Sequence, residues 1–229
     1  MDLSEAMRTN GACRSFLPDR VPPEVFTRAI EVARFAPTGG NRQGVRLLVV
    51  ENRQKKRQLG EWLLGPVESG IEAMRAAIAS GDAASRADER TARISDLEST
   101  FAATIDLCKD MAHVPAVLVF LVDLSTVHFT DTNLDRISIS GGASVYPFVQ
   151  NFMLALRQEG VASCMTTQLA EFEPQVRQLL GIPSTYATAC FVPVGYPRNG
   201  FPKKLSRLPP EELIFLDTFD RPLVSGSVA

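Results

Sequence analysis

The sequence has few of the residues from which a self-contained catalytic site is usually built. Only two histidines occur among the 229 residues, His113 and His128, and neither belongs to an H-E-x-x-H motif or a cysteine–histidine cluster, which argues against zinc catalysis. A G-x-S-x-G nucleophile elbow is absent, as are a P-loop and a G-x-G-x-x-G motif after a strand. The chemistry is therefore expected to come from a bound cofactor.

Long hydrophobic runs and an excess of basic charge are also missing. The longest apolar stretch, Val114–Val122, has nine residues, too few to cross a bilayer. Polar residues follow Met1 directly, so no signal peptide is expected. The formal net charge is −2, which gives no basic surface for nucleic acid. We expect a cytoplasmic protein that acts on a small molecule, without a membrane or nucleic-acid partner.

Cysteines are few and scattered. Four occur, without a C-x-x-C pair, at Cys13, Cys108, Cys164 and Cys190. Their spacing gives no disulfide framework, so free, mostly buried thiols in a reducing compartment are expected. Hydrophobic residues make up 45% of the chain and charged residues 22%, values typical of an ordinary globular core.

Hydrophobic periodicity and turn residues predict an α+β fold, in which helices alternate with a few short central strands. Helices are expected over residues 22–36, 142–160 and 173–180, and strands over 45–50, 113–123, 161–165 and 185–194. Residues 52–112 should form two or three helices with breaks at Gly65-Pro66 and at Ser80-Gly81-Asp82, and with a mobile helical excursion or lid over Ala83–Arg93. Residues 131–140 form a polar connection, and the last 35 residues should be extended.

Four segments carry polar or glycine residues that suit a ligand. Each also has an ordinary structural explanation when it is taken alone. Pro37–Asn41 either approaches a planar ligand or ends a helix. Arg14 either binds a phosphate or lies beside an electron-accepting ring, or it forms a surface ion pair with Asp19 or Glu24. Gln150 and Asn151, in an apolar helix, bind a ligand or a neighbouring strand. The cations Lys203, Lys204 and Arg207 bind phosphate or are simply solvated.

The order of these segments is more specific than any one of them. The chain reads A-P-T-G-G-N-x-Q near residue 40 and Y-P-x-x-Q-N near 150, then G-x-x-S-C-x-T-T, P-V-G-Y-P and R-L-P-P-E-E. This pattern resembles the nitroreductase family of FMN-dependent oxidoreductases over residues 6–50 and 113–220. The resemblance implies one domain over residues 1–229, in an α+β fold with a central, mainly antiparallel sheet flanked by helices. It also implies an intertwined homodimer, with 196–229 as a dimer-wrapping tail and 66–112 as a variable helical excursion near the site.

The resemblance further assigns cofactor-binding residues. Arg14 corresponds to the cation near the N1–O2 side of the flavin, and the partner chain would contribute a turn formed by Pro37, Thr38, Gly39 and Asn41. Thr166, Thr167 and Gln168 correspond to the stretch along the isoalloxazine, near N5. Arg207 corresponds to the arginine that holds the FMN phosphate, with Lys204 as a possible neighbour.

Two departures from the family pattern concern the phosphate and the turn. Asn10-Gly11-Ala12 stands where the family has R-x-S, and Gly44-Val45 follows Gln43 where N-x-Q-P-W is usual. We hypothesise that Arg8 or Lys203 compensates for the missing arginine.

The implied reaction is a ping-pong hydride transfer from NADPH or NADH, through flavin N5, to a nitroaromatic, quinone or enone. It needs no catalytic side chain, and Arg14 and Thr167 would tune the flavin. Two alternatives stay open: a flavin-binding protein without turnover, and a divergent family member that removes halogen or cleaves flavin.

Overall fold

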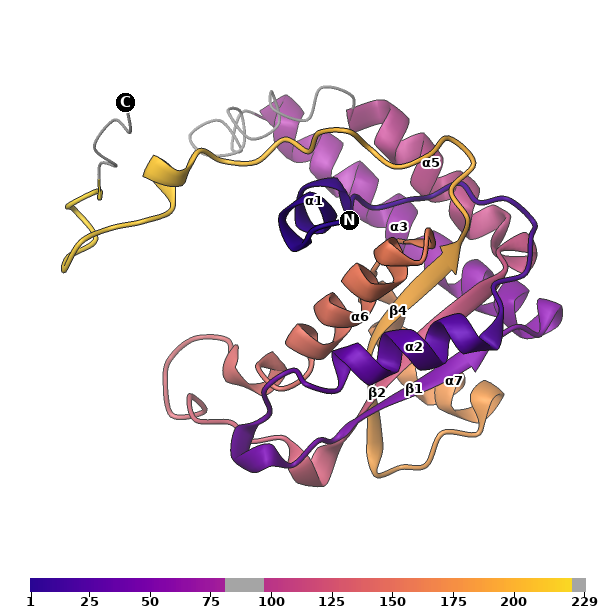
Figure 1. The fold of residues 1–229 in the computed structure, drawn as a ribbon, viewed down its shortest axis with the longest axis horizontal. Helices are drawn as coiled ribbons and strands as arrows, with labels where there is room; N and C mark the ends of the chain where they lie inside the picture. The colour runs from indigo at the N-terminus through magenta and orange to yellow at the C-terminus, as the bar shows by residue number, and fades with distance from the viewer. Residues whose placement is uncertain (81–96, 224–229) are drawn as a thin grey trace.

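A four-stranded antiparallel sheet forms the centre of the molecule (Figure 1). The computed structural model describes residues 1–80 and 97–223. The strands are β1 (Val45–Val50), β2 (Ala116–Asp123), β3 (Ala162–Ser163) and β4 (Tyr186–Gly195), in the spatial order β1-β2-β4-β3. The α+β prediction is thus confirmed. The strand predicted from residue 113 begins three residues later, because Met111–His113 closes into a 3-10 turn.

Helices cover both faces of this sheet. They are α1 (Leu3–Thr9), α2 (Pro23–Ala33), α3 (Arg53–Ser80), α5 (Leu97–Lys109), α6 (Tyr146–Gln158) and α7 (Glu173–Leu180). Helices α2 and α6 pack on one face, and α3 and α5 on the other. No helix in the described part of the chain combines the length and apolar character that crossing a bilayer requires.

The central strand β2 separates two hydrophobic layers. Its side chains alternate, as pleating requires, so that Val117 and Val119 join the α3–α5 layer while Leu118 and Phe120 join the α2–α6 layer. These four side chains are no more than 1% exposed, which confirms the prediction of a strand buried on both faces. The pairing of β2 with β4 shifts register at Phe120/Leu121, where a bulge strengthens the local twist.

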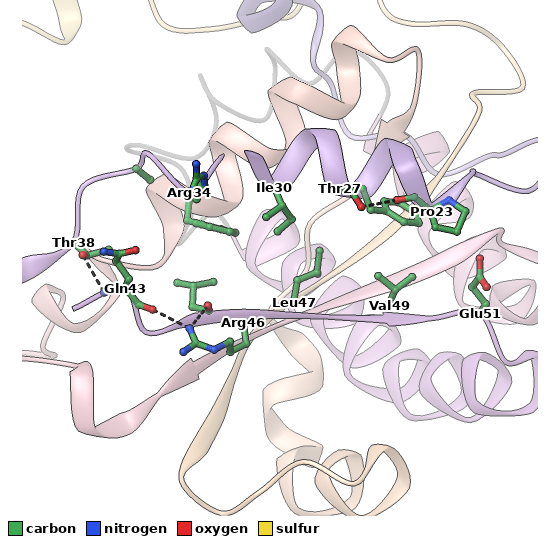
Figure 2. Close-up of a pocket in the computed structure, with 14 residues that line it drawn as sticks. Pro23, Thr27, Ile30, Arg34, Thr38, Gln43, Arg46, Leu47, Val49 and Glu51 are labelled. Carbon is green, nitrogen blue, oxygen red and sulfur yellow. Dashed lines mark hydrogen bonds between the residues drawn. The ribbon is translucent and has the colours of Figure 1, made fainter. Parts of the chain in front are cut away.

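Strand β1 lies at the edge of the sheet, and helix α2 runs alongside it (Figure 2). The bounds predicted for this strand are confirmed, but its predicted burial is wrong, because only Val50 is buried in it. An apolar groove of about 700 Å³ opens between the two elements, with Ile30 on one wall and Leu47 and Val49 on the other. In a single chain, therefore, the apolar side chains of β1 are only partly covered.

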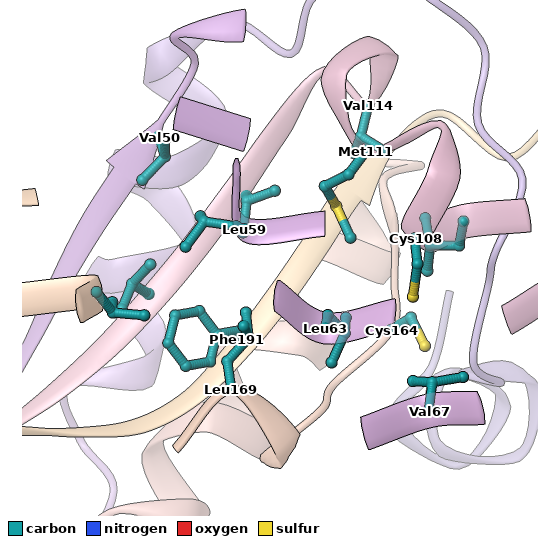
Figure 3. Packing of buried hydrophobic residues seen from close by; sticks show 14 of the residues in the cluster. Val50, Leu59, Leu63, Val67, Cys108, Met111, Val114, Cys164, Leu169 and Phe191 are labelled. Atoms are coloured by element: carbon teal, nitrogen blue, oxygen red, sulfur yellow. The ribbon is translucent and has the colours of Figure 1, made fainter. Parts of the chain in front are cut away.

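Helix α3 does not break at Gly65-Pro66, contrary to the prediction, and it continues through the proline to residue 80. Leu59, Leu63 and Val67 recur at four-residue spacing on its buried face and pack toward Phe191 of the sheet (Figure 3). The free energy gained by burying this face outweighs the free energy lost when proline removes one backbone hydrogen bond from the helix. The excursion predicted over residues 83–93 lies outside the described residues, and α5 resumes at residue 97.

The polar connection over residues 131–140 is organised by one buried carboxylate, that of Asp131. It accepts hydrogen bonds from Ser138 Oγ (2.6 Å), Ile139 N (2.9 Å) and Arg136 Nη1 (2.8 Å), and from Ser140 Oγ. The serine hydroxyls, the Ile139 amide and the Arg136 guanidinium hold the pKa of Asp131 far below its usual range. This loop is therefore tied together by an ionised group.

The C-terminal segment is extended, as predicted, from about residue 201 to 209, and a 3-10 turn follows at Pro210–Glu212. Contrary to the prediction, residues 214–223 fold back on themselves, with Phe215 paired to Pro222. Figure 1 shows the segment leaving the end of β4, turning back by α5 and running away from the body of the molecule. Large apolar side chains along it are exposed, among them Leu213, Ile214 and Phe219. A single chain leaves these residues without a core to join.

Candidate functional site

The turn between α2 and β1, which contains Pro37–Asn41, has an unusual backbone. Gly40, Asn41 and Gln43 all have positive φ angles, of 60°, 54° and 50°, a conformation rarely adopted by residues other than glycine. Two side-chain acceptors fix it: Thr38 Oγ1 accepts from Gln43 N at 3.2 Å, and Ser144 Oγ accepts from Gly39 N at 3.0 Å. The turn is thus held in place while Pro37, Gly39 and Asn41 remain exposed.

A second group of predicted residues gathers at β3. The N–H of Cys13 donates to Ser163 O at 2.9 Å, which places Arg14 beside the stretch that follows β3. In that stretch, Thr166 exchanges two backbone hydrogen bonds of 2.8 Å with Phe191, and Thr166 Oγ1 accepts from Gln168 N at 3.3 Å. Arg14 therefore lies beside Ser163, opposite Val194 of β4, whereas Thr166–Gln168 begins opposite Phe191, nearer the middle of that strand.

Arg14 has hydrogen-bonding capacity that its own chain does not use. Its Nε is buried and has no partner among the described residues, and its Nη1 reaches only Ala12 O, at 3.5 Å. Its charge also acts on the neighbouring thiol: burial raises the pKa of Cys164, and the Arg14 guanidinium lowers it in part. An unpaired buried donor is costly, so this site suits a ligand that offers an acceptor.

The N-terminal segment and the C-terminal segment run side by side near this group. Leu17 N donates to Tyr196 O at 2.8 Å, and Arg198 N donates to Ser15 O at 3.1 Å. Further along, a Cβ placed on Gly11 would lie 2.8 Å from Pro202 Cγ and 2.9 Å from Leu205 Cδ2. Glycine is needed here for close approach. Residues 10–12 thus lie against the segment that carries Lys204.

Lys204 and Arg207 are both exposed on this segment. Arg207 donates to the carbonyl of its neighbour, Ser206, at 2.6 Å. Their packing on the body of the chain is light, so the described structure leaves their ammonium and guanidinium groups accessible to an anion.

One chain does not bring all the predicted residues together. The turn lies at the start of β4, since Gly44 O accepts from Asp123 N at 3.0 Å and Asp123 pairs with Tyr186. Arg14 lies at the other end, beside Ser163, which pairs with Val194. Tyr186 and Val194 are eight residues apart, so at about 3.3 Å per residue the turn and Arg14 are separated by roughly 26 Å along β4. A single chain therefore leaves Arg14 and the turn at opposite ends of this strand.

The structure corrects the prediction for Gln150 and adds one residue, Arg157, that the sequence analysis did not name. Gln150, expected to be buried, is exposed on α6, because the apolar face of that helix is formed by other positions. Arg157, which the sequence analysis did not single out, donates from Nη2 to Thr9 Oγ1 at 3.1 Å and has a buried, unpartnered Nε. An isolated arginine on an apolar helix is the signal that could have found it.

Comparison with known proteins identifies relatives of this chain. The model of the nitroreductase family matches residues 9–196. A 4-nitrobenzoate reductase from Pseudomonas putida is 25% identical over 215 residues, which are 92% of this chain and 92% of that protein.

Two solved structures resemble the fold closely. An oxidized iodotyrosine deiodinase bound to FMN and 3-iodo-L-tyrosine has a TM-score of 0.67 at 23% identity, and the match covers 91% of this chain and 96% of that one. A mutant of NfnB, an FMN- and NADPH-dependent nitroreductase from Sphigopyxis sp. strain HMH, has a TM-score of 0.67 at 18% identity, with coverages of 96% and 100%. At these identities the structural likeness establishes the fold.

Proposed function

Since the chain belongs to the nitroreductase family, we propose that it is an FMN-dependent oxidoreductase that uses NADPH or NADH to reduce a small electron acceptor. The observation that carries this proposal is the buried, unpartnered Nε of Arg14 next to Cys164, in the segment that leads to Thr166–Gln168. The 4-nitrobenzoate reductase relative and the FMN-binding structural neighbours support it. When bound, FMN supplies the redox chemistry, by accepting a hydride at N5 and passing it to the acceptor.

Arg14 would hold the N1–O2 side of the flavin, where its positive charge would favour the negative charge of the reduced ring. A guanidinium that is already fixed in a partly buried position needs little reorganisation when that charge develops, which is the condition for effective electrostatic stabilisation. Within the chain, the hydrogen bond from Arg14 Nη1 to Ala12 O is long, at 3.5 Å. Binding of the flavin would therefore give its Nε an acceptor.

The stretch over 166–168 offers a backbone donor toward N5. The N–H of Thr166 is occupied by Phe191 O, and that of Gln168 by Thr166 Oγ1. The N–H of Thr167, at the start of the 3-10 turn Gln168–Phe172, has no partner among the described residues. Thr167 N is thus the donor we assign to N5, and Arg207 and Lys204 are assigned to the phosphate.

A second copy of this chain completes the site. Pro37–Asn41 and Arg14 are about 26 Å apart along β4 in one chain, so the turn of one protomer would contact the flavin held by the other. The groove between α2 and the edge strand β1 and the exposed apolar residues of the C-terminal tail support such an exchange. Analytical ultracentrifugation should find a dimer for the full chain and a weaker dimer for a chain that ends before Pro210.

The visible absorption spectrum of the purified protein, recorded before and after NADPH or NADH is added, tests the function. A flavin spectrum that bleaches, followed by reoxidation with 4-nitrobenzoate or menadione, is the expected result. A flavin that stays oxidised with both nucleotides would favour a binding protein without turnover. Reoxidation by 3-iodo-L-tyrosine with release of iodide would favour the dehalogenating alternative instead. A protein that fails to take up FMN would refute the proposal.

A further inference from the structure

Arg157, in the last turn of α6, connects three parts of the chain that are distant in sequence. Its guanidinium carbon lies 3.6 Å from the centre of the Phe201 ring, and its Nη2 donates to Thr9 Oγ1 at 3.1 Å. The stacking and the hydrogen bond fix the plane of the guanidinium. The side chain is therefore held in one orientation before any ligand arrives.

The charge of Arg157 is not balanced by a carboxylate among the described residues. Arg28, by contrast, donates two hydrogen bonds to Glu159 near the end of the same helix. In residues 1–80 and 97–223, only two buried side-chain nitrogen or oxygen atoms lack a hydrogen-bond partner, Nε of Arg14 and Nε of Arg157. A half-buried cation with an unused donor is unfavourable unless an anion approaches it.

The position of Arg157 indicates which anion this is. Thr9 directly precedes Asn10–Ala12, and Phe201 directly precedes the segment that carries Lys203 and Lys204. These two segments touch, because Gly11 packs against Pro202 and Leu205. Arg157 thus lies where the segment assigned to the FMN phosphate meets the segment that lacks the family's arginine and serine.

We propose that Arg157 is a phosphate-binding residue of the cofactor site and supplies the cation that Asn10–Ala12 lack. This inference rests on the proposed FMN-dependent function. Arg8 and Lys203, which the sequence suggested for this role, are exposed. Arg157 offers an oriented guanidinium whose Nε is directed to no group of its own chain, an arrangement well suited to a phosphate oxygen.

Binding of FMN and of riboflavin by the full chain, stripped of flavin, separates this role from a structural one. Riboflavin has the same ring and ribityl chain without the phosphate. Quenching of flavin fluorescence gives both dissociation constants for the wild type and for Arg157→Ala. We expect the variant to bind FMN roughly ten- to a hundredfold more weakly, as for a lost charge-assisted hydrogen bond, and to bind riboflavin as the wild type does. Arg177→Ala, a half-buried arginine in the last turn of α7, is the matched control and should change neither constant.

The outcomes are distinct. If Arg157→Ala weakens both flavins equally, or neither, the phosphate role of Arg157 is wrong. If the wild type binds no FMN, the proposed function is itself refuted, and the role of Arg157 with it. Should Arg157→Ala fail to fold by circular dichroism, Arg157→Gln decides: it should keep the fold and still lose preference for FMN over riboflavin, because its neutral amide has no charge to offer the phosphate. An unchanged preference in a folded Arg157→Gln would overturn the proposal.

Discussion

Replacing Arg14 with glutamine should make bound FMN harder to reduce. The guanidinium of Arg14 has a buried Nε without a partner and one distant contact within its own chain, so its donors are available to the reduced flavin. A hydrogen bond to a charged group contributes about 1.5–3 kcal/mol. For a two-electron couple, about 1.4 kcal/mol corresponds to about 30 mV. The midpoint potential of Arg14→Gln should therefore fall by about 30–65 mV.

Equilibration with a reference dye during slow reduction measures this potential. Arg198→Gln is the matched control, because Arg198 lines the same small cavity as Arg14, of about 210 Å³, but donates to Phe16 O at 2.8 Å. The control should leave the potential within about 10 mV of the wild type, since its loss removes no donor to the flavin. Equal shifts in the two variants would indicate a general change of field, and an unshifted Arg14→Gln would refute the assignment of Arg14.

Three further predictions concern the fold. Gly60→Ala should lower the free energy of unfolding in urea by about 1–3 kcal/mol, because the new Cβ would lie 2.3 Å from the backbone oxygen of Cys108. The control Gly70→Ala, at an exposed position of the same helix, should instead raise that free energy by up to about 1 kcal/mol. Equal effects of the two substitutions would contradict the close approach at Gly60. Burial raises the pKa of Cys108 to about 11, so iodoacetamide should label the half-buried Cys13 of the native protein first, as mass spectrometry of the peptides can check. Asp131 has a folded pKa below its unfolded value of 3.8, so its ionised form stabilises the fold above that pH and the contribution is lost as the pH falls below it. Asp131→Asn should therefore have a lower Tm than the wild type at pH 7, and the gap between the two Tm values should narrow as the pH falls below 3.8. A gap that does not change with pH would contradict this account.

The elements that the sequence predicted best are those whose apolar pattern and flanking turns agree. The bounds of β1 match the predicted residues 45–50, and α7 ends where Gly181 adopts a positive φ of 72°. The predicted break at Pro66 failed because local preference was outweighed by burial of Leu59, Leu63 and Val67. Propensity describes a residue, whereas the packed face of α3 is a property of the whole helix.

The residues of the candidate site also differ in whether the sequence alone could identify them. Arg14 and Thr166–Gln168 were identified from a family resemblance, and the structure places Arg14 next to Ser163, in the strand that leads to Thr166–Gln168. Arg157 escaped notice because its contacts, Thr9 and Phe201, are far from it in sequence. No periodicity links such positions, so only the fold reveals that they meet.

Because β2 divides the hydrophobic core into two layers, substitutions in the two layers should act largely independently. Neighbouring residues such as Val119 and Phe120 belong to different layers, so a change of volume in one layer is absorbed largely by the helices on that side. A substitution in the α3–α5 layer is therefore expected to disturb the packing of its own layer more than that of the α2–α6 layer, and the converse holds for the other side of the sheet.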